Sequence, residues 1–145
     1  MYVTKRSGES EDIQLNKIHN VLNWAAEGLS NVSISQIELK SHIQFYDGMP
    51  TYEIQETLIK TAADLISEES PDYQYLAARL NIFHLRKQVY GTFIPPALFN
   101  HVTALVLTEH YDKELITKYN QSDWEYLNTV IDHSKDLNYS YCAVK

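Results

Sequence analysis

Residues 2–18 read YVTKRSGESEDIQLNKI, and this stretch decides how the rest of the chain is interpreted. It opens with β-branched and aromatic residues, and Ser7-Gly8 then supplies turn chemistry. Residues 2–14 are therefore predicted to form a β-hairpin whose second strand ends near Ile13. An isolated hairpin is only marginally stable, so we expect it to lie on the helices that follow.

Four helices are predicted after the hairpin, because apolar residues recur three or four positions apart. Their expected limits are the N-cap Asn16 to Gly28, the capping box at Ser35 to about Phe45, the cap Thr51 to about Ile66, and Ser70-Pro71 to Gly91. The loop over residues 47–50 leaves room for one more short strand. Together these elements predict an α+β fold that is mainly α.

Pro95-Pro96 marks the internal boundary that the sequence indicates, because neither proline can continue a helix from its amide side. We therefore expect a first domain over residues 1–91 and a helical segment over residues 92–145. A capping box is expected at Ser122. The apolar-rich end of the sequence, with no cap and no polar tail, leads us to expect a piece of a longer chain.

Some side chains are assigned to the interior by their type and spacing. Trp24, Tyr46 and Phe83 are aromatic residues at helical spacing and are expected in the core. The lone Cys142 is expected to be a buried small hydrophobe. His84 is interpreted as a partly satisfied core or surface residue rather than a ligand.

The composition excludes several classes of function. With 12 Lys and Arg against 19 Asp and Glu, the formal charge is −7, which disfavours a general nucleic-acid binder. One cysteine excludes intramolecular disulfides and multi-cysteine zinc sites. The glycines Gly8, Gly28, Gly48 and Gly91 lie too far apart for a glycine-rich phosphate loop. No apolar run reaches the roughly 20 residues that span a bilayer, and we expect a cytoplasmic protein.

The hairpin and the helix start nevertheless gather positive charge. Lys5 and Arg6 stand side by side on the predicted strand, and Lys17 lies in the first turn of the first helix. The unpaired N–H groups and dipole of a helix N-terminus also favour an anion. Two interpretations stay open on these residues alone: a site for a polyphosphate, and a hairpin whose charges simply face solvent.

The same stretch resembles a known signature. Val3-Thr4-Lys5-Arg6-Ser7-Gly8, followed by Ile13 and Lys17-Ile18, is similar to the V-x-K-R-x-G…I…K-I pattern of the ATP-cone, a small nucleotide-sensing domain of many ribonucleotide reductases. Residues 21–29, 42–48 and 71–80 resemble the large (alpha) subunit of the bacterial aerobic class I enzyme, ribonucleoside-diphosphate reductase. Residues 92–145 resemble the helical region that leads into its catalytic barrel. The resemblance covers essentially the whole chain.

The resemblance implies a four-helix cone lidded by a small sheet, which binds ATP or dATP, with Mg²⁺, as an overall activity switch. The positions that match the family's nucleotide contacts are Val3, Lys5, Arg6, Glu11, Asp12, Ile13, Gln14, Leu15, Asn16, Lys17, Ile18, Thr51, Ile54, Gln55 and Lys87. Lys5, Arg6 and Lys87 suit the triphosphate. Glu11 and nearby backbone groups suit the adenine amino group, and the apolar members of the set suit the base.

Two positions depart from the pattern of the family. Gln14 stands where the closest relatives carry Asn, which is still an amide. Gln55 stands where they carry His, near the sugar and phosphates. Gln keeps hydrogen-bonding capacity but cannot become cationic. The selectivity between ATP and dATP is therefore the property that this substitution affects most.

By the same resemblance, the parent enzyme is an oxidoreductase that supplies deoxyribonucleotides for DNA replication, and this piece alone catalyses nothing. Its implied partners are the nucleotide, other alpha subunits and the radical-generating beta subunit, without nucleic acid or membrane. ATP would favour the active arrangement and dATP the inhibited one. Two alternatives remain: a helical protein-interaction module without a ligand, and a nucleotide hydrolase, which the missing phosphate loop disfavours.

Overall fold

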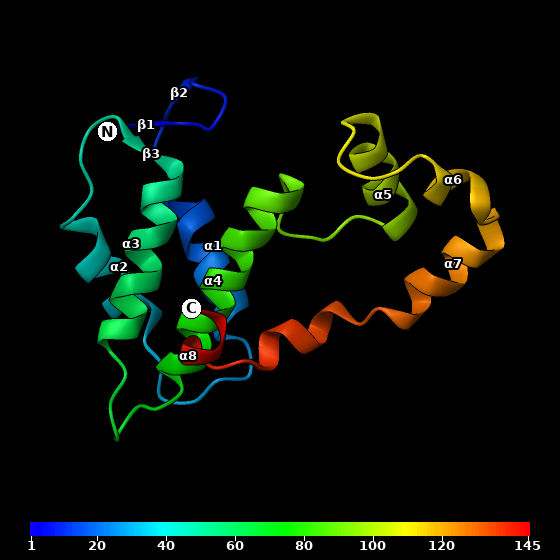
Figure 1. The fold of residues 1–145 in the computed structure, drawn as a ribbon. Coiled ribbons are helices and arrows are strands. Elements are labelled where there is room, and N and C mark those ends of the chain that lie inside the picture. The colour runs from blue at the N-terminus through cyan, green and yellow to red at the C-terminus, as the bar shows by residue number, and fades with distance from the viewer. The chain divides into compact units, whose positions relative to one another are not determined.

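The computed structural model describes residues 1–145, and the chain divides into two compact units, residues 1–85 with 136–145 and residues 86–135. The strands are β1 (Tyr2–Thr4), β2 (Ser10–Asp12) and β3 (Met49–Pro50). The helices are α1 (Leu15–Ala26), α2 (Ile34–His42), α3 (Thr51–Asp64), α4 (Tyr73–Tyr90), α5 (Leu98–Leu107), α6 (Glu114–Lys118), α7 (Gln121–Val130), the 3₁₀ helix η1 (His133–Asn138) and α8 (Tyr141–Val144). The predicted α+β fold, mainly α, is confirmed (Figure 1). None of the helices is both long and apolar enough to cross a membrane.

The small sheet has the strand order β2-β1-β3, with β1 antiparallel to β2 and parallel to β3. The turn between β1 and β2 is closed by two hydrogen bonds, from the Lys5 amide to the Glu9 carbonyl and from the Gly8 amide to the Lys5 carbonyl. Gly8 has φ +88°, as expected for the left-handed position of a three-residue hairpin loop. Strand β1 ends at Thr4, so the strand is shorter than predicted and Arg6 lies in the turn.

Within the first unit, hydrogen bonds attach the hairpin to the loop that precedes α3. The Tyr2 amide donates to Asp47 Oδ1 at 2.9 Å, and the Gly48 amide donates to the Tyr2 carbonyl at 2.9 Å. The Thr4 hydroxyl donates to the Gly48 carbonyl at 3.0 Å. The additional short strand expected here is confirmed as β3, and it runs directly into α3 at one end of the bundle (Figure 1).

The predicted N-caps of the first two helices are wrong by two residues. Helix α1 begins at Leu15 with Gln14 as its N-cap, so Asn16 lies inside the helix. Helix α2 begins at Ile34, and its N-cap Ser33 accepts from the Gln36 amide at 3.2 Å. The cap is the last residue with extended backbone, and both Gln14 and Ser33 are extended. The chain therefore turns helical two residues earlier than the side-chain pattern indicated.

Other helix limits also differ in part from the prediction. Helix α4 begins at Tyr73 rather than at Ser70-Pro71, but it ends at Tyr90, directly before Gly91, as predicted. Helix α7 does have a capping box, but Asn120 forms it instead of Ser122. The Asn120 side chain accepts from the Asp123 amide at 2.9 Å, and the Asp123 side chain accepts from the Asn120 amide at 3.0 Å.

The core of the first unit is formed by apolar faces of α1, α2, α3 and α4. Its fully buried side chains include Leu22, Ile37 and Leu76. Phe83 is 8% exposed, as expected, but Trp24 is 56% exposed and Tyr46 51% exposed, so both were wrongly placed in the core. Trp24 follows Leu22 by two residues, and two residues turn a helix by about 200°, which directs the indole away from the core.

The last residues of the chain belong to the first unit. Arg79 on α4 donates to the carbonyls of Ala25 at 3.1 Å, Glu27 at 2.7 Å and Leu137 at 3.1 Å. One guanidinium therefore satisfies the end of α1 and also holds the returning segment. Cys142 is exposed on the single-turn α8, so the prediction that it is buried was wrong.

The second unit is built around contacts between α5 and α7. The Leu98 amide donates to Asn128 Oδ1 at 2.9 Å, and Val102 and Trp124 are buried. The Trp124 ring lies 5.9 Å from the Phe99 ring and 6.0 Å from the Tyr119 ring. These contacts give the second unit a small aromatic core of its own.

Candidate functional site

The inner face of the hairpin carries both apolar and charged side chains. Val3 is 4% exposed, so this face of β1 is turned toward the interior. Glu11 is paired with Val3 in the antiparallel register, and paired residues project from the same face of a sheet. Lys5 follows Val3 by two residues and therefore shares that face. Asp12 pairs with Tyr2 on the opposite face, and both are exposed, so Asp12 is directed away from this group.

A three-residue charge cluster joins the hairpin to the start of α1. Glu11 Oε2 lies 3.0 Å from Lys5 Nζ, and Glu11 Oε1 lies 3.6 Å from Lys17 Nζ. The hydrogen bond from Lys5 holds the pKa of Glu11 below its ordinary value, and the same bond raises the pKa of Lys5. Two ammonium groups thus face one carboxylate beside a helix N-terminus. The cluster keeps one net positive charge at the place where a helix favours an anion.

A second group of polar side chains involves Arg6, α3 and α4. His84 is 7% exposed, and its Nδ1 lies 2.8 Å from Gln55 Oε1. Its Nε2 lies 3.9 Å from Glu56 Oε1. Burial lowers the pKa of His84, and the positive charge of Arg6 lowers it further, so the guanidinium acts on this ring. The positive charge in the turn of the hairpin therefore acts on His84, which in turn contacts Gln55.

Apolar side chains from three elements complete the group. Val3 on β1, Ile18 on α1 and Ile54 on α3 are all buried, while Ile13 is half-buried. The Ile13 amide donates to the Met1 carbonyl at 2.9 Å, which continues the pairing of the two strands. These residues provide nonpolar surface next to the charged ones. We call the polar side chains together the hairpin site: Lys5, Arg6, Glu11, Lys17, Gln55 and His84.

The other residues predicted for the nucleotide site lie near the starts of α1 and α3 and at the end of α4. Gln14, Leu15 and Asn16 are exposed at the start of α1, and Thr51 is half-buried at the start of α3. Lys87 lies in the last turn of α4, within the second unit, and its Nζ is 5.1 Å from the centroid of the Phe93 ring. The role of Lys87 at the phosphates stays a prediction.

The sequence interpretation did not assign His84 to the site. It treated this histidine as a core or surface residue, and the burial agrees with that interpretation. What it missed is the pairing with Gln55, which is 29 residues away in the chain. A signal was present, because His84 and Lys87 are three residues apart and such residues share one face of a helix.

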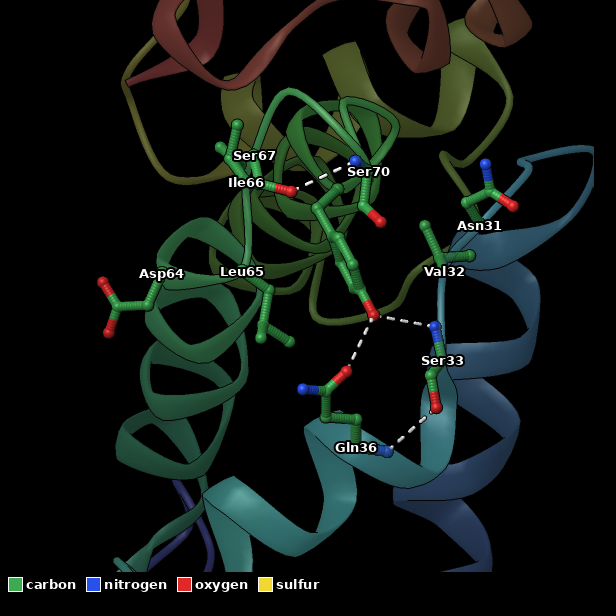
Figure 2. Close-up of a pocket in the computed structure, with 10 residues that line it drawn as sticks. Asn31, Val32, Ser33, Gln36, Asp64, Leu65, Ile66, Ser67 and Ser70 are labelled. Atoms are coloured by element: carbon green, nitrogen blue, oxygen red, sulfur yellow. Dashed lines mark hydrogen bonds between the residues drawn. The ribbon is translucent and has the colours of Figure 1, made fainter.

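A separate cavity of about 530 Å³ lies at the base of the bundle, and Figure 2 shows the side chains that line it. The Tyr73 hydroxyl accepts from the Ser33 amide at 2.8 Å and lies 3.4 Å from Gln36 Oε1. This base cavity is lined by Asn31, Val32, Ser33, Gln36, Asp64, Leu65, Ile66, Ser67, Ser70 and Tyr73. Its one charged lining residue is the acidic Asp64, so the base cavity is unsuited to a polyphosphate. None of the predicted site residues lines it.

Comparisons with known proteins show the family of the chain. Residues 1–88 match the family model described as the ATP cone domain. The chain is 60% identical over 145 residues to the ribonucleoside-diphosphate reductase 1 subunit alpha of Escherichia coli (strain K12) and 59% identical over 145 residues to the corresponding Haemophilus influenzae subunit. It is 43% identical over 141 residues to the subunit of Enterobacteria phage T4. The chain covers 19%, 19% and 18% of these relatives, about a fifth of their length.

Proposed function

The chain belongs to the ATP-cone family, and from that premise we propose that its hairpin site binds ATP or dATP. The observation that carries this proposal is the cluster in which Lys5 and Lys17 flank Glu11 beside the N-terminus of α1. A polyphosphate needs several cations and N–H donors, and no glycine-rich loop is present to supply them. Side chains of the hairpin and the helix start fill that need.

We assign phosphate binding to the positively charged side chains of the hairpin and of α1. Lys5, Arg6 and Lys17 bring three positive charges, of which Glu11 offsets one. A bound triphosphate carries more negative charge than this remainder. We therefore propose that Mg²⁺ accompanies the nucleotide on its phosphate oxygens.

Adenine recognition falls to Glu11 and the buried apolar residues. The shorter contact of Glu11, 3.0 Å, joins its Oε2 to Lys5, whereas its Oε1 makes the longer contact of 3.6 Å with Lys17. Oε1 is thus the oxygen that can accept from an adenine amino group while Oε2 stays bonded to Lys5. Guanine presents a carbonyl oxygen at the corresponding position, which a carboxylate would repel.

The regulatory role follows from linkage between binding and conformation. Two ligands switch a protein only if they interact with its two states by different free energies. We propose that the chain is the overall activity switch of a ribonucleoside-diphosphate reductase alpha subunit, and that the switch acts on the assembly of alpha with beta subunits. The family match and the names of the relatives support this proposal.

Titration calorimetry with ATP, dATP and GTP tests the binding proposal. The 145-residue chain should bind both adenine nucleotides and discriminate against GTP. Replacing Lys5 with Ala should weaken binding by about 10-fold to 100-fold, the usual range for a hydrogen bond to a charged group. Replacing the exposed Lys113 of the second unit with Ala is the matched control and should leave the affinity unchanged.

Three results would contradict the proposal. Absence of heat with every nucleotide would favour the protein-interaction module without a ligand. Steady release of phosphate from ATP by the purified chain would favour the hydrolase. Equal weakening by the Lys5 and Lys113 substitutions would place the nucleotide elsewhere on the molecule.

A further inference from the structure

A buried histidine, His84, contacts Gln55, one of the residues of the hairpin site, and this contact defines which ring nitrogen carries the proton. His84 Nδ1 lies 2.8 Å from Gln55 Oε1, and a carbonyl oxygen can only accept. Nδ1 is therefore the donor, and in the neutral ring the proton is on Nδ1. A second proton would add at Nε2, the nitrogen that lies 3.9 Å from Glu56 Oε1.

The charges around the ring explain why it stays neutral before a nucleotide binds. The ring is 7% exposed, and burial disfavours the imidazolium form. From the hairpin, the Arg6 guanidinium opposes a second positive charge, while Glu56 on α3 favours one. On α4 itself, the next charged residues along the chain are Arg86 and Lys87. Burial and Arg6 outweigh Glu56, so the pKa of His84 lies below its ordinary value of 6.5.

A polyphosphate that binds Arg6 reverses this balance. The negative charge of the ligand cancels the repulsion from the guanidinium, and it also attracts an imidazolium directly. Glu56 Oε1 already lies 3.9 Å from Nε2, so its negative charge favours the proton that is added to this nitrogen. The Nδ1 donation to Gln55 is the same in both protonation states, so the ring need not turn over.

We propose that His84 takes up a proton when the nucleotide binds, so that nucleotide binding tightens as the pH falls. This coupling rests on the nucleotide site proposed above and adds a regulatory property to it. Linkage is reciprocal, so each unit by which the ligand raises the pKa of His84 tightens binding by about tenfold between the basic and acidic limits. Above both pKa values the ring is neutral with and without ligand, and affinity is independent of this group.

Calorimetry at several pH values between about 8 and 6 measures the coupling. Titrations of dATP at each pH in two buffers that both hold that pH but differ in ionisation enthalpy give the number of protons taken up. The terminal phosphate of the nucleotide titrates near about pH 6, and this contribution is common to all variants. His84→Asn keeps a donor for Gln55 but cannot titrate, and His110→Asn removes an exposed histidine of the second unit as the matched control.

The wild type and His110→Asn should take up more protons than His84→Asn, and only His84→Asn should lose the extra tightening at low pH. Equal proton uptake by all three proteins would overturn the coupling while leaving the nucleotide site intact. Absence of nucleotide binding at every pH would instead overturn the proposed function. Should His84→Asn fail to fold, NMR titration of the His84 ring in the wild type decides: its pKa must rise with dATP, and an unchanged pKa overturns the proposal.

Discussion

Substitution of Gly48 by Ala tests how the hairpin is attached to the bundle. Gly48 has φ +84°, and a Cβ at this position would lie 3.2 Å from Tyr2 Oη and 3.3 Å from Tyr2 Cε2. Gly28 has a similar φ of +74°, but a Cβ there would meet nothing within 4 Å. The two glycines therefore share the backbone cost, and only Gly48 adds a close contact.

The expected magnitudes follow from these two contributions. A side chain in the left-handed region costs about 1–2 kcal/mol, of which the smaller entropy of the unfolded Ala chain returns about 0.4–1 kcal/mol. Gly28→Ala should therefore lose about 1 kcal/mol. Gly48→Ala should lose about 2 kcal/mol, because the Tyr2 ring must move by a few tenths of an ångström. For a chain of this size, these losses lower Tm by about 4 °C and 8 °C.

Thermal denaturation followed by circular dichroism measures both variants, and a double-mutant cycle isolates the contact. In a Tyr2→Ala background, Gly48→Ala should cost no more than Gly28→Ala, because the close contact is gone. Equal losses for the two glycine variants in the wild-type background, or no coupling between positions 2 and 48, would refute the argument that Gly48 fixes the hairpin through Tyr2.

Three further predictions concern the site and its supports. Gln55→His should change the ratio of ATP to dATP affinities, because imidazole can become cationic and an amide cannot. Parallel calorimetric titrations measure this ratio, and an unchanged ratio would show that residue 55 does not determine the selectivity. Arg79→Gln should lower the free energy of unfolding by about 1.5–3 kcal/mol, because three carbonyls lose a charged donor. Urea denaturation measures this loss, and a midpoint equal to that of the wild type would contradict the stabilising role of Arg79. The pKa of Glu11 lies below its ordinary value of 4.5 because Lys5 donates to it. The stability that Glu11 contributes is therefore fully present above pH 4.5 and is lost as the pH falls through the folded-state pKa. Glu11→Gln should flatten the acid limb of the stability curve, and parallel curves for the two proteins would contradict the ion pair.

The sequence predicted the order of the elements well because local chemistry determines most of them. The hairpin depends on a turn glycine at position 8, and α4 ends directly before the glycine at position 91. The caps were less predictable. Gln14 precedes α1 without making a side-chain cap, so no residue type marks that boundary. The extended backbone that follows β2 continues through Gln14, and α1 begins at the next residue.

The candidate site was predictable in its charges but not in its contacts. The cationic residues of the hairpin were found from their type and position alone. The pairing of Gln55 with His84 depends on how α3 packs against α4, and nothing in the local sequence of either helix specifies that register. Trp24 is a second example of a contact that the sequence did not predict. It was expected in the core, but it follows the buried Leu22 by only two residues and is exposed.

The central claim is that the hairpin site, and not the base cavity, receives the nucleotide. Two-dimensional NMR of the isotope-labelled chain during titration with dATP tests this claim most directly. We predict saturable shift changes centred on Lys5, Glu11 and Gln55, while Ser33 and Tyr73 at the base cavity stay unperturbed. Shift changes centred on Ser33 and Tyr73, or none at saturating nucleotide, would contradict the account.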